Sequence, residues 1–354
     1  MNERSEGLRA ELDKVGLECM LVTRIENVRY LTGFQGSNGA VLMTPDAALL
    51  MTDGRYREQA NRQAPGWDVL IYSGSMVESI EKILPYGARC GFEVTCRYDS
   101  YRKLAKTLGE SRLEPLDGTV EKLRVVKDAG EVRSIKAALG CALKGFAALR
   151  EKISPGMSER ELAAELDYRM ALAGADSPAF DTIVGSGPNS SQPHAPISDR
   201  RLEPQDLVMI DFGALKAGYR SDTTRTVCIR TFDKEQEKVH DTVASAVEAA
   251  MEKIAPGIEA SAVDAAAREV VAVAGYGERF THALGHGVGL ETHESPTISS
   301  VSNDVLEPGM IFTIEPGIYI EGWGGVRIEE MVLITSDGFE ILSESLPREI
   351  RLQP

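Results

Sequence analysis

The 354-residue sequence has no long apolar run and no cysteine framework. No segment reaches the roughly 18 uninterrupted apolar residues of a membrane helix, so we predict no membrane span. The five cysteines are scattered and form no CxxC pair, which argues against a disulfide framework or a zinc ribbon and favours a reducing compartment. Residues 1–14 are charged and lack the apolar core of a signal peptide, so we expect a cytoplasmic protein.

Positive charge is also scarce, because 39 lysines and arginines face 54 aspartates and glutamates, for a net charge of −15. This excess argues against duplex nucleic acid or an anionic membrane as the main partner. It leaves many carboxylates that could bind cations.

The chain is long enough for two domains, and the pattern of predicted helices and strands changes near residues 120–127. Residues 1–122 alternate short strand-like runs, such as 19–22, with helical patterns such as 55–63, which predicts an α/β domain. Residues 128–354 begin with capping-box patterns and mix helices with strand pairs, which predicts an α+β domain. In this domain we expect helices at 129–152, 159–173, 234–253 and 260–273, and strands at 207–212, 223–229, 310–314 and 331–335.

Histidine is rare, and three of the five histidines lie within twelve residues. His282 and His286 have the spacing of a helical zinc pair, but the glycines between and after them fit a strand or loop better. No glutamate lies between them, so the HExxH metalloprotease motif is excluded. We expect His240, on a predicted helix, to be a surface or packing residue.

Four acids are placed beside apolar strands in two predicted hairpins. Asp211 ends one apolar run and Asp222 follows eleven residues later; Glu315 ends another and Glu329 follows fourteen residues later. Each acid alone could belong to a salt bridge or a turn. A buried, unpaired carboxylate is costly, however, and four carboxylates balance two divalent cations. Oxygen ligands with one imidazole favour manganese, cobalt or zinc.

Together, these residues resemble the five metal ligands of the M24 metallopeptidases, which have the pita-bread (creatinase/methionine aminopeptidase) fold. The set comprises Asp211, Asp222, His286, Glu315 and Glu329. The matching strings are residues 210–213, 221–226, 285–290, 315–317 and 326–330. Residues 27–34 and 53–56 are similar to the creatinase-type N-terminal domain of proline peptidases. The resemblance implies such a domain at 1–122 and a pita-bread catalytic domain at 128–354.

The resemblance also implies a role for each ligand. Asp211 would hold one metal ion, and His286 and Glu315 the other, while Asp222 and Glu329 would bridge the two. A metal-bridging hydroxide would be the nucleophile, with Glu315 as its proton acceptor.

Four further residues match positions outside the ligand set. The resemblance implies that His194 and His293 hydrogen-bond the substrate and its developing oxyanion, that His282 lines the pocket, and that Arg327 marks the proline-specific branch. Arg327 could instead form a salt bridge with an adjacent glutamate, Glu329 or Glu330. We expect the tyrosines Tyr219 and Tyr319 to pack in strands rather than contact substrate.

The function implied is hydrolysis of the Xaa-Pro bond of short proline-containing peptides, by an Xaa-Pro aminopeptidase or an Xaa-Pro dipeptidase (prolidase). Some prolidases carry an arginine four residues after the His293 equivalent, where this chain has Thr297, which favours the aminopeptidase. The alternatives are a creatinase-like hydrolase without metals and a non-catalytic peptide-binding module. Retention of all five ligand types argues against both. Proteins that this chain resembles are commonly homodimers, so we expect a homodimer.

Overall fold

The computed structural model describes residues 3–351, which form two compact units that divide between Arg124 and Val125. The N-terminal unit is an α/β domain, and the second unit mixes helices with mainly antiparallel strands. No helix within residues 3–351 combines the length and the apolar character needed to cross a membrane.

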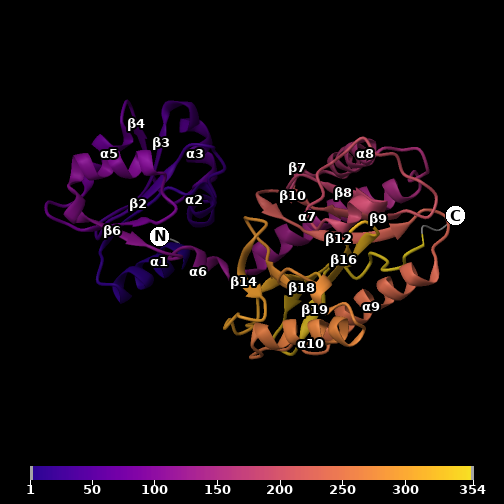
Figure 1. The fold of residues 1–354 in the computed structure, drawn as a ribbon. Coiled ribbons are helices and arrows are strands. Elements are labelled where there is room, and N and C mark those ends of the chain that lie inside the picture. Colours follow the sequence, from indigo (N-terminus) through magenta and orange to yellow (C-terminus); the bar gives the residue numbers. More distant parts are fainter. Residues whose placement is uncertain (1–2, 352–354) are drawn as a thin grey trace. The chain divides into compact units, whose positions relative to one another are not determined.

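The N-terminal unit is built on one mixed sheet with the strand order β4-β3-β2-β1-β5-β6 (Figure 1). The central strand β1 pairs antiparallel with β2 and parallel with β5. The strands are β1 (Cys19–Val22), β2 (Ala40–Met43), β3 (Ala48–Asp53), β4 (Asp68–Tyr72), β5 (Cys90–Glu93) and β6 (Leu113–Leu116). The helices are α1 (Glu3–Lys14), α2 (Ile25–Thr32), α3 (Arg57–Gln63), α4 (Met76–Ile83), α5 (Tyr98–Leu108) and α6 (Glu121–Arg124).

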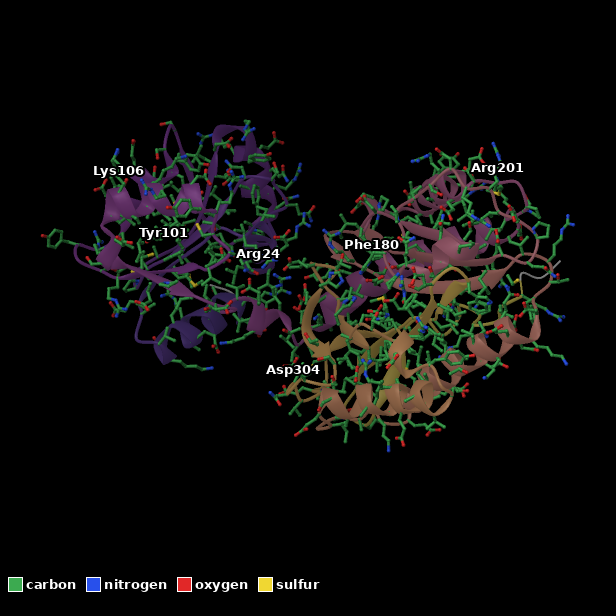
Figure 2. The ribbon with its side chains drawn as sticks, in the orientation of Figure 1. Arg24, Tyr101, Lys106, Phe180, Arg201 and Asp304 are labelled. Carbon is green, nitrogen blue, oxygen red and sulfur yellow. The ribbon has the colours of Figure 1, made fainter. Side chains whose placement is uncertain are left out.

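The strand predicted at 19–22 is confirmed, whereas the helix predicted at 55–63 begins only at Arg57. The Asp53 side chain accepts a hydrogen bond from the Arg55 backbone N–H and holds residues 54–56 in a 3₁₀ turn. Elsewhere in this unit, Tyr101, which is labelled in Figure 2, lies on α5. Its ring stacks on that of Phe92, with centroids 5.4 Å apart.

The helices of the second unit follow the predicted positions closely, because capping boxes at Asp128, Ser158 and Asp233 fix three of their starts. They are α7 (Ala129–Arg150), α8 (Glu159–Leu172), α9 (Lys234–Met251) and α10 (Ala260–Val273). The longer strands are β8 (Ile183–Ser186), β9 (Leu207–Phe212), β12 (Thr223–Cys228), β14 (Glu294–Ile298), β15 (Ile311–Ile314), β16 (Gly317–Ile320), β17 (Gly324–Arg327) and β18 (Glu330–Ile334). The short strands are β7 (Ser177–Pro178), β10 (Ala214–Lys216), β11 (Tyr219–Arg220), β13 (Gly285–Gly287) and β19 (Phe339–Ile341).

Two helix pairs pack on the strands of this unit (Figure 1). Helices α7 and α8 share a core with β8, β9 and β12, in which Phe146 stacks on Phe212 at 4.9 Å between centroids. Helices α9 and α10 share a second core with β15, β17 and β18. The four predicted acids lie on strands or strand ends between these cores.

The two acid-bearing hairpins are antiparallel, as predicted. Strand β9 pairs with β12, with Asp211 opposite Thr224, and β15 pairs with β18. Asp211 lies within its strand, but the other three acids lie one residue beyond a strand end.

The prediction of a strand or loop around His286 is confirmed, since it lies on β13, between β14 and β15. A Cβ atom on Gly285 would lie 1.9 Å from the Thr313 carbonyl oxygen, and one on Gly287 would lie 2.2 Å from that of Ser295. Glycine therefore permits the close backbone approach that brings His286 beside the second acid hairpin.

Candidate metal centre

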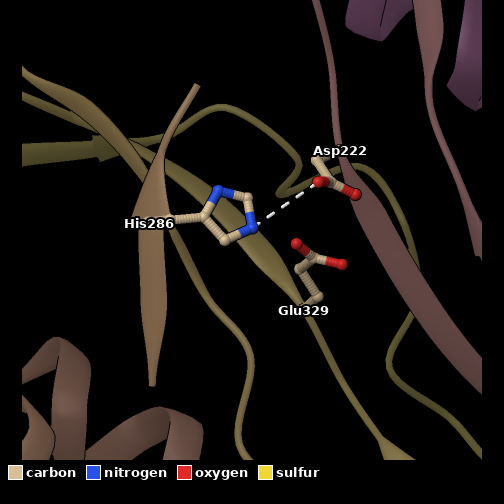
Figure 3. A group of neighbouring side chains, drawn as sticks. All are labelled: Asp222, His286 and Glu329. Carbon is tan, nitrogen blue, oxygen red and sulfur yellow. Dashed lines mark ion pairs between the residues drawn. The ribbon is translucent and has the colours of Figure 1, made fainter. Parts of the chain in front are cut away.

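Three of the predicted ligands converge from three different strands or strand ends. One ligand atom each of Asp222, His286 and Glu329 lies within 4.8 Å of the other two, and their side chains point toward one another (Figure 3). Asp222 Oδ2 is 3.7 Å from His286 Nε2. Within residues 3–351 this is the one group of three such side chains that meets this spacing.

The other two predicted ligands adjoin this group. Glu315 Oε1 is 3.3 Å from His286 Nε2 and accepts a hydrogen bond from the Thr313 hydroxyl at 3.3 Å. Asp211 Oδ2 accepts a hydrogen bond from Arg327 Nη2 at 2.7 Å. Its other oxygen, Oδ1, is buried and has no hydrogen-bond partner. An unsatisfied carboxylate oxygen in the interior is costly unless a cation binds it.

The pKa shifts of the group also indicate that a cation would stabilise its charged acids. Burial raises the pKa of Asp222 well above its usual value, and the charges of Glu329 and Asp211 raise it further. Burial and the charges of Glu315 and Asp211 raise the pKa of Glu329 in the same way. Burial acts against the charge on Glu315 and His286 too, but their mutual contact outweighs it, lowering the pKa of the acid and raising that of the imidazole.

This donor set fits divalent metal ions. It combines four carboxylates and one imidazole, which suits manganese, cobalt or zinc. The orphaned oxygen of Asp211 and the mutual repulsion of the acids are both relieved by a bound cation.

Thr224 is a member of the site that the sequence analysis did not single out. Its side chain is fully buried, donates a hydrogen bond to Glu329 Oε2 at 2.8 Å and accepts one from Arg327 Nε at 3.0 Å. The sequence signal was present, since Thr224 lies two residues after Asp222 and so shares its side of the chain.

The position of Arg327 resolves an alternative that the sequence left open. Its ion pair is with Asp211, and no ion pair with Glu329 or Glu330 is found. Its Nη1 donates to the Tyr319 hydroxyl at 2.9 Å and to the Pro193 carbonyl at 3.1 Å. Arg327 thus links one predicted ligand to a loop far away in sequence.

Tyr319 does more than the predicted strand packing. It is buried in β16, but its hydroxyl is also 3.0 Å from His282 Nε2, and burial raises its pKa to about 12. A sequence reading of packing alone could not foresee this hydroxyl contact. Tyr219 donates to Glu131 Oε1 at 2.9 Å.

The predicted outer histidines differ in exposure: His282 is half-buried, whereas His194 and His293 are exposed. The His293 ring lies 4.2 Å from that of His286, between centroids, and burial together with the His286 charge lowers its pKa. His194 is exposed in the loop after β8, and its charge also lowers the pKa of His293. Burial lowers the pKa of His282.

His240 is a buried residue of α9, in agreement with the predicted packing role, and its Nε2 lies 2.8 Å from the Arg348 carbonyl oxygen.

Family models match both units of the chain. The model of metallopeptidase family M24 matches residues 133–336, and that of the creatinase/prolidase N-terminal domain matches residues 4–126.

Individual proteins are similar over almost the whole chain. The Xaa-Pro dipeptidase of Pyrococcus horikoshii is 37% identical over 346 residues, which cover 98% of each chain. The solved structure of an Xaa-Pro dipeptidase from Bacillus anthracis has a TM-score of 0.95 and 38% identity, and covers 99% of both chains. That of an X-Pro aminopeptidase from Thermotoga maritima has a TM-score of 0.88 and 37% identity, and covers 96% of this chain and 99% of its own. These matches confirm the predicted pairing of a creatinase-type N-terminal domain with a pita-bread catalytic domain, and the chain belongs to metallopeptidase family M24.

Proposed function

We propose that this protein is a dinuclear-metal exopeptidase that hydrolyses the Xaa-Pro bond of short peptides. The observation that carries the proposal is the group of buried, mutually repelling carboxylates around His286 in a member of a metallopeptidase family. Relatives with Xaa-Pro names at 37–38% identity support the substrate class.

The metal site would hold two divalent ions, manganese first, with cobalt or zinc as the other candidates. His286 and Glu315 would hold one ion and Asp211 the other, with Asp222 and Glu329 shared between them. When bound, such ions polarise a carbonyl oxygen and lower the pKa of water so that it attacks at neutral pH.

The side chains around the ions would divide the remaining work. Glu315 would accept the proton of the attacking water at a carboxylate oxygen, since its lowered pKa keeps it ionised. The lowered pKa of His293 favours a neutral imidazole, which would donate a hydrogen bond to the carbonyl oxygen as negative charge develops there. His194 would assist as a second donor. His282 would line the pocket, with its ring held by the hydroxyl of Tyr319.

Arg327 would act by fixing Asp211 and the Pro193 carbonyl at once. This arrangement ties a metal-holding acid to the loop that carries His194. The arginine would therefore serve the site through its neighbours.

The solved structures named as a dipeptidase and as an aminopeptidase are almost equally identical to this chain, so identity does not choose between the two activities. The residue at position 297 does bear on that choice. Thr297 is exposed on β14, and its backbone N–H donates to Asp304 Oδ2 at 2.9 Å. A threonine beside an acid offers no positive charge to the free carboxylate of a dipeptide. This position favours the aminopeptidase, with the dipeptidase as the second candidate.

Hydrolysis of a Gly-Pro dipeptide and of an Xaa-Pro-Pro tripeptide, each with manganese, cobalt and zinc, tests this proposal. We expect cleavage of the bond before proline, faster for the tripeptide. Faster cleavage of the dipeptide would favour the dipeptidase. A protein that binds two ions but cleaves neither peptide would overturn the proposal in favour of a binding module, and activity that survives complete metal removal would favour a creatinase-like hydrolase.

Two further proposals concern assembly and location. We propose a homodimer, tested by light scattering, in which a mass near 38.5 kDa would indicate a monomer. We also place the protein in the cytoplasm, and all five cysteines are unpaired, in keeping with a reducing compartment. Fractionation of the source cells tests the location.

A further inference from the structure

A buried acid outside the metal centre has no part in the function proposed above. Glu159 is the first residue of α8, and its side chain is completely inaccessible to solvent. A buried carboxylate is kept in a protein interior when donors satisfy both of its oxygens. The donor residues show which segments of the chain Glu159 holds together.

Two donor residues flank one loop, and a third lies within it. On one side, the backbone N–H and hydroxyl of Ser186 donate to Oε1, both at 2.7 Å. On the other side, the hydroxyl of Ser198 donates to Oε2 at 2.5 Å and its backbone N–H donates at 3.2 Å. Asn189 Nδ2 lies 3.0 Å from Oε1 and 3.2 Å from Oε2. One carboxylate therefore closes the base of the loop 187–197.

This loop carries His194. The loop also contacts Arg327, which pairs with the predicted ligand Asp211. The Pro193 carbonyl accepts a hydrogen bond from Arg327 Nη1 at 3.1 Å. Farther back, Ser190 Oγ accepts one from the Gly325 N–H at 2.8 Å. The loop is thus held at its base by Glu159 and near His194 by the arginine that pairs with Asp211. His194 is exposed, so its own packing does little to fix it.

The contacts at the base match a side chain that accepts hydrogen bonds at both oxygens. Every group that contacts the Glu159 side chain from Ser186, Asn189 and Ser198 is a donor, and a carboxylate is an acceptor at both oxygens. A glutamine of the same shape would turn an NH₂ group toward one of the two serines. One side of the loop would then lose hydrogen bonds to this side chain while the other kept them.

We propose that Glu159 is a positioning residue that holds the loop 187–197 so that His194 reaches the substrate. The inference rests on the proposed function, in which His194 donates to the reacting carbonyl. Glu159 acts through the loop and does not itself touch substrate.

A double-mutant cycle between Glu159→Gln and His194→Ala on the metal-loaded full-length protein tests this inference. Glu159→Gln should lower kcat by about tenfold, less than the roughly hundredfold loss expected for His194→Ala, because the imidazole is displaced but present. The double variant should be no slower than His194→Ala alone, since no imidazole is left to position. The metal content should stay near that of the wild type throughout.

Glu161→Gln is the matched control. Glu161 lies two residues farther along α8, is 59% exposed at its side chain and accepts a hydrogen bond from the Ser158 N–H at 2.8 Å. This change perturbs the same helix start without touching the loop, so kcat should not change. Amide hydrogen exchange should be faster at residues 187–197 in Glu159→Gln and unchanged there in Glu161→Gln.

Ser198→Ala keeps the inference testable if Glu159→Gln fails to fold. It removes one donor on the His194 side of the base and should give a smaller loss of kcat that again disappears in the His194→Ala background. Losses that multiply in the double variants would overturn the inference, since they would show that Glu159 acts independently of His194. If His194→Ala alone kept full kcat, the role proposed for His194 would fail, and this inference with it.

Discussion

Glu329 and Glu330 are adjacent in sequence and almost equally buried, at 2% and 1% exposure, yet their surroundings are opposite. Glu330 lies among cations and donors: Arg225 Nη2 at 2.8 Å, Arg348 Nε at 2.7 Å and the Ser343 hydroxyl. Glu329 lies among acids, and within residues 3–351 the Thr224 hydroxyl is the one donor to its side chain, at 2.8 Å.

Strand geometry causes the difference. Successive side chains of a strand point to opposite faces, so Asp222 and Thr224 share a face that Arg225 does not. We call Asp222, Thr224 and Glu329 the ligand face, and Arg225 and Glu330 the anchor face. The anchor face is satisfied within the protein, since Arg225 also donates to the Leu346 carbonyl at 2.9 Å. A buried acid whose neighbours satisfy it is structural, whereas one whose neighbours repel it marks a cation site.

The largest expected effect is a loss of metal and activity when an acid of the ligand face is replaced. Asp222→Asn should remove at least one metal ion and nearly all activity, because the ligand face loses a charge that only a cation balances. Metal analysis and kcat/KM on the same preparation measure this effect. Full metal occupancy with full turnover in Asp222→Asn would contradict the ligand assignment.

The matching change on the anchor face should affect stability instead. Glu330→Gln should lower the free energy of unfolding by about 3–5 kcal/mol, because it leaves Arg225 buried without its carboxylate. Denaturant unfolding measures this change. The folded fraction should still bind two ions, and a loss of metal without a loss of stability would break the comparison between the faces.

Replacement of the outer histidines should lower kcat without disturbing the ligand face or the anchor face. Replacing His293 or His194 by alanine should lower kcat by about 10²-fold, as expected when a donor to a developing oxyanion is removed. The metal content should stay near two ions per chain. A loss of metal in step with rate would make either histidine a ligand, and a lower melting temperature with unchanged kcat per folded molecule would make it structural.

Metal affinity should depend on pH through the ligand face. The raised pKa values of Asp222 and Glu329 mean that, without metal, these acids bind protons more readily than free carboxyl groups do, and a cation competes with those protons. Affinity for Mn²⁺ should therefore rise with pH, and binding should release protons. Calorimetry in buffers of different ionisation enthalpy measures this release. The release should persist in Glu330→Gln, which leaves the ligand face intact.

The smallest expected effect concerns His240, which supports the anchor face through the Arg348 carbonyl. Burial lowers its pKa, so the folded state binds this proton less readily than the unfolded state. Its contribution to stability should be complete above the unfolded pKa of about 6.5, and should be lost as pH falls through the folded pKa. The slope should not exceed about 1.4 kcal/mol per pH unit, the limit for one proton. Urea unfolding from pH 7.5 to 5 should show a shallower slope in His240→Gln, and an unchanged slope would assign it to other groups.

Much of the fold could be predicted from local signals. The helix starts at Asp128 and Ser158 follow from capping boxes, and the strands at 207–212 and 223–228 follow from apolar and β-branched runs. The start of α3 at Arg57 and the helices α2, α4 and α5 did not follow in this way. A side-chain bond from Asp53 delays α3, and the other three carry no capping box like those at Asp128 and Ser158.

By itself, the sequence determined that two hairpins carry acids at strands or strand ends, and that a glycine-flanked histidine accompanies them. These are properties of local pattern, and they do not depend on what packs against what. Only the tertiary structure decided that Arg327 pairs with Asp211, that Tyr319 contacts His282, and that one acid at the start of α8 closes a loop. Those contacts join residues from 37 to 116 positions apart. They depend on how strands from separate hairpins align, which hydrogen-bond register and side-chain packing fix only once the chain has folded.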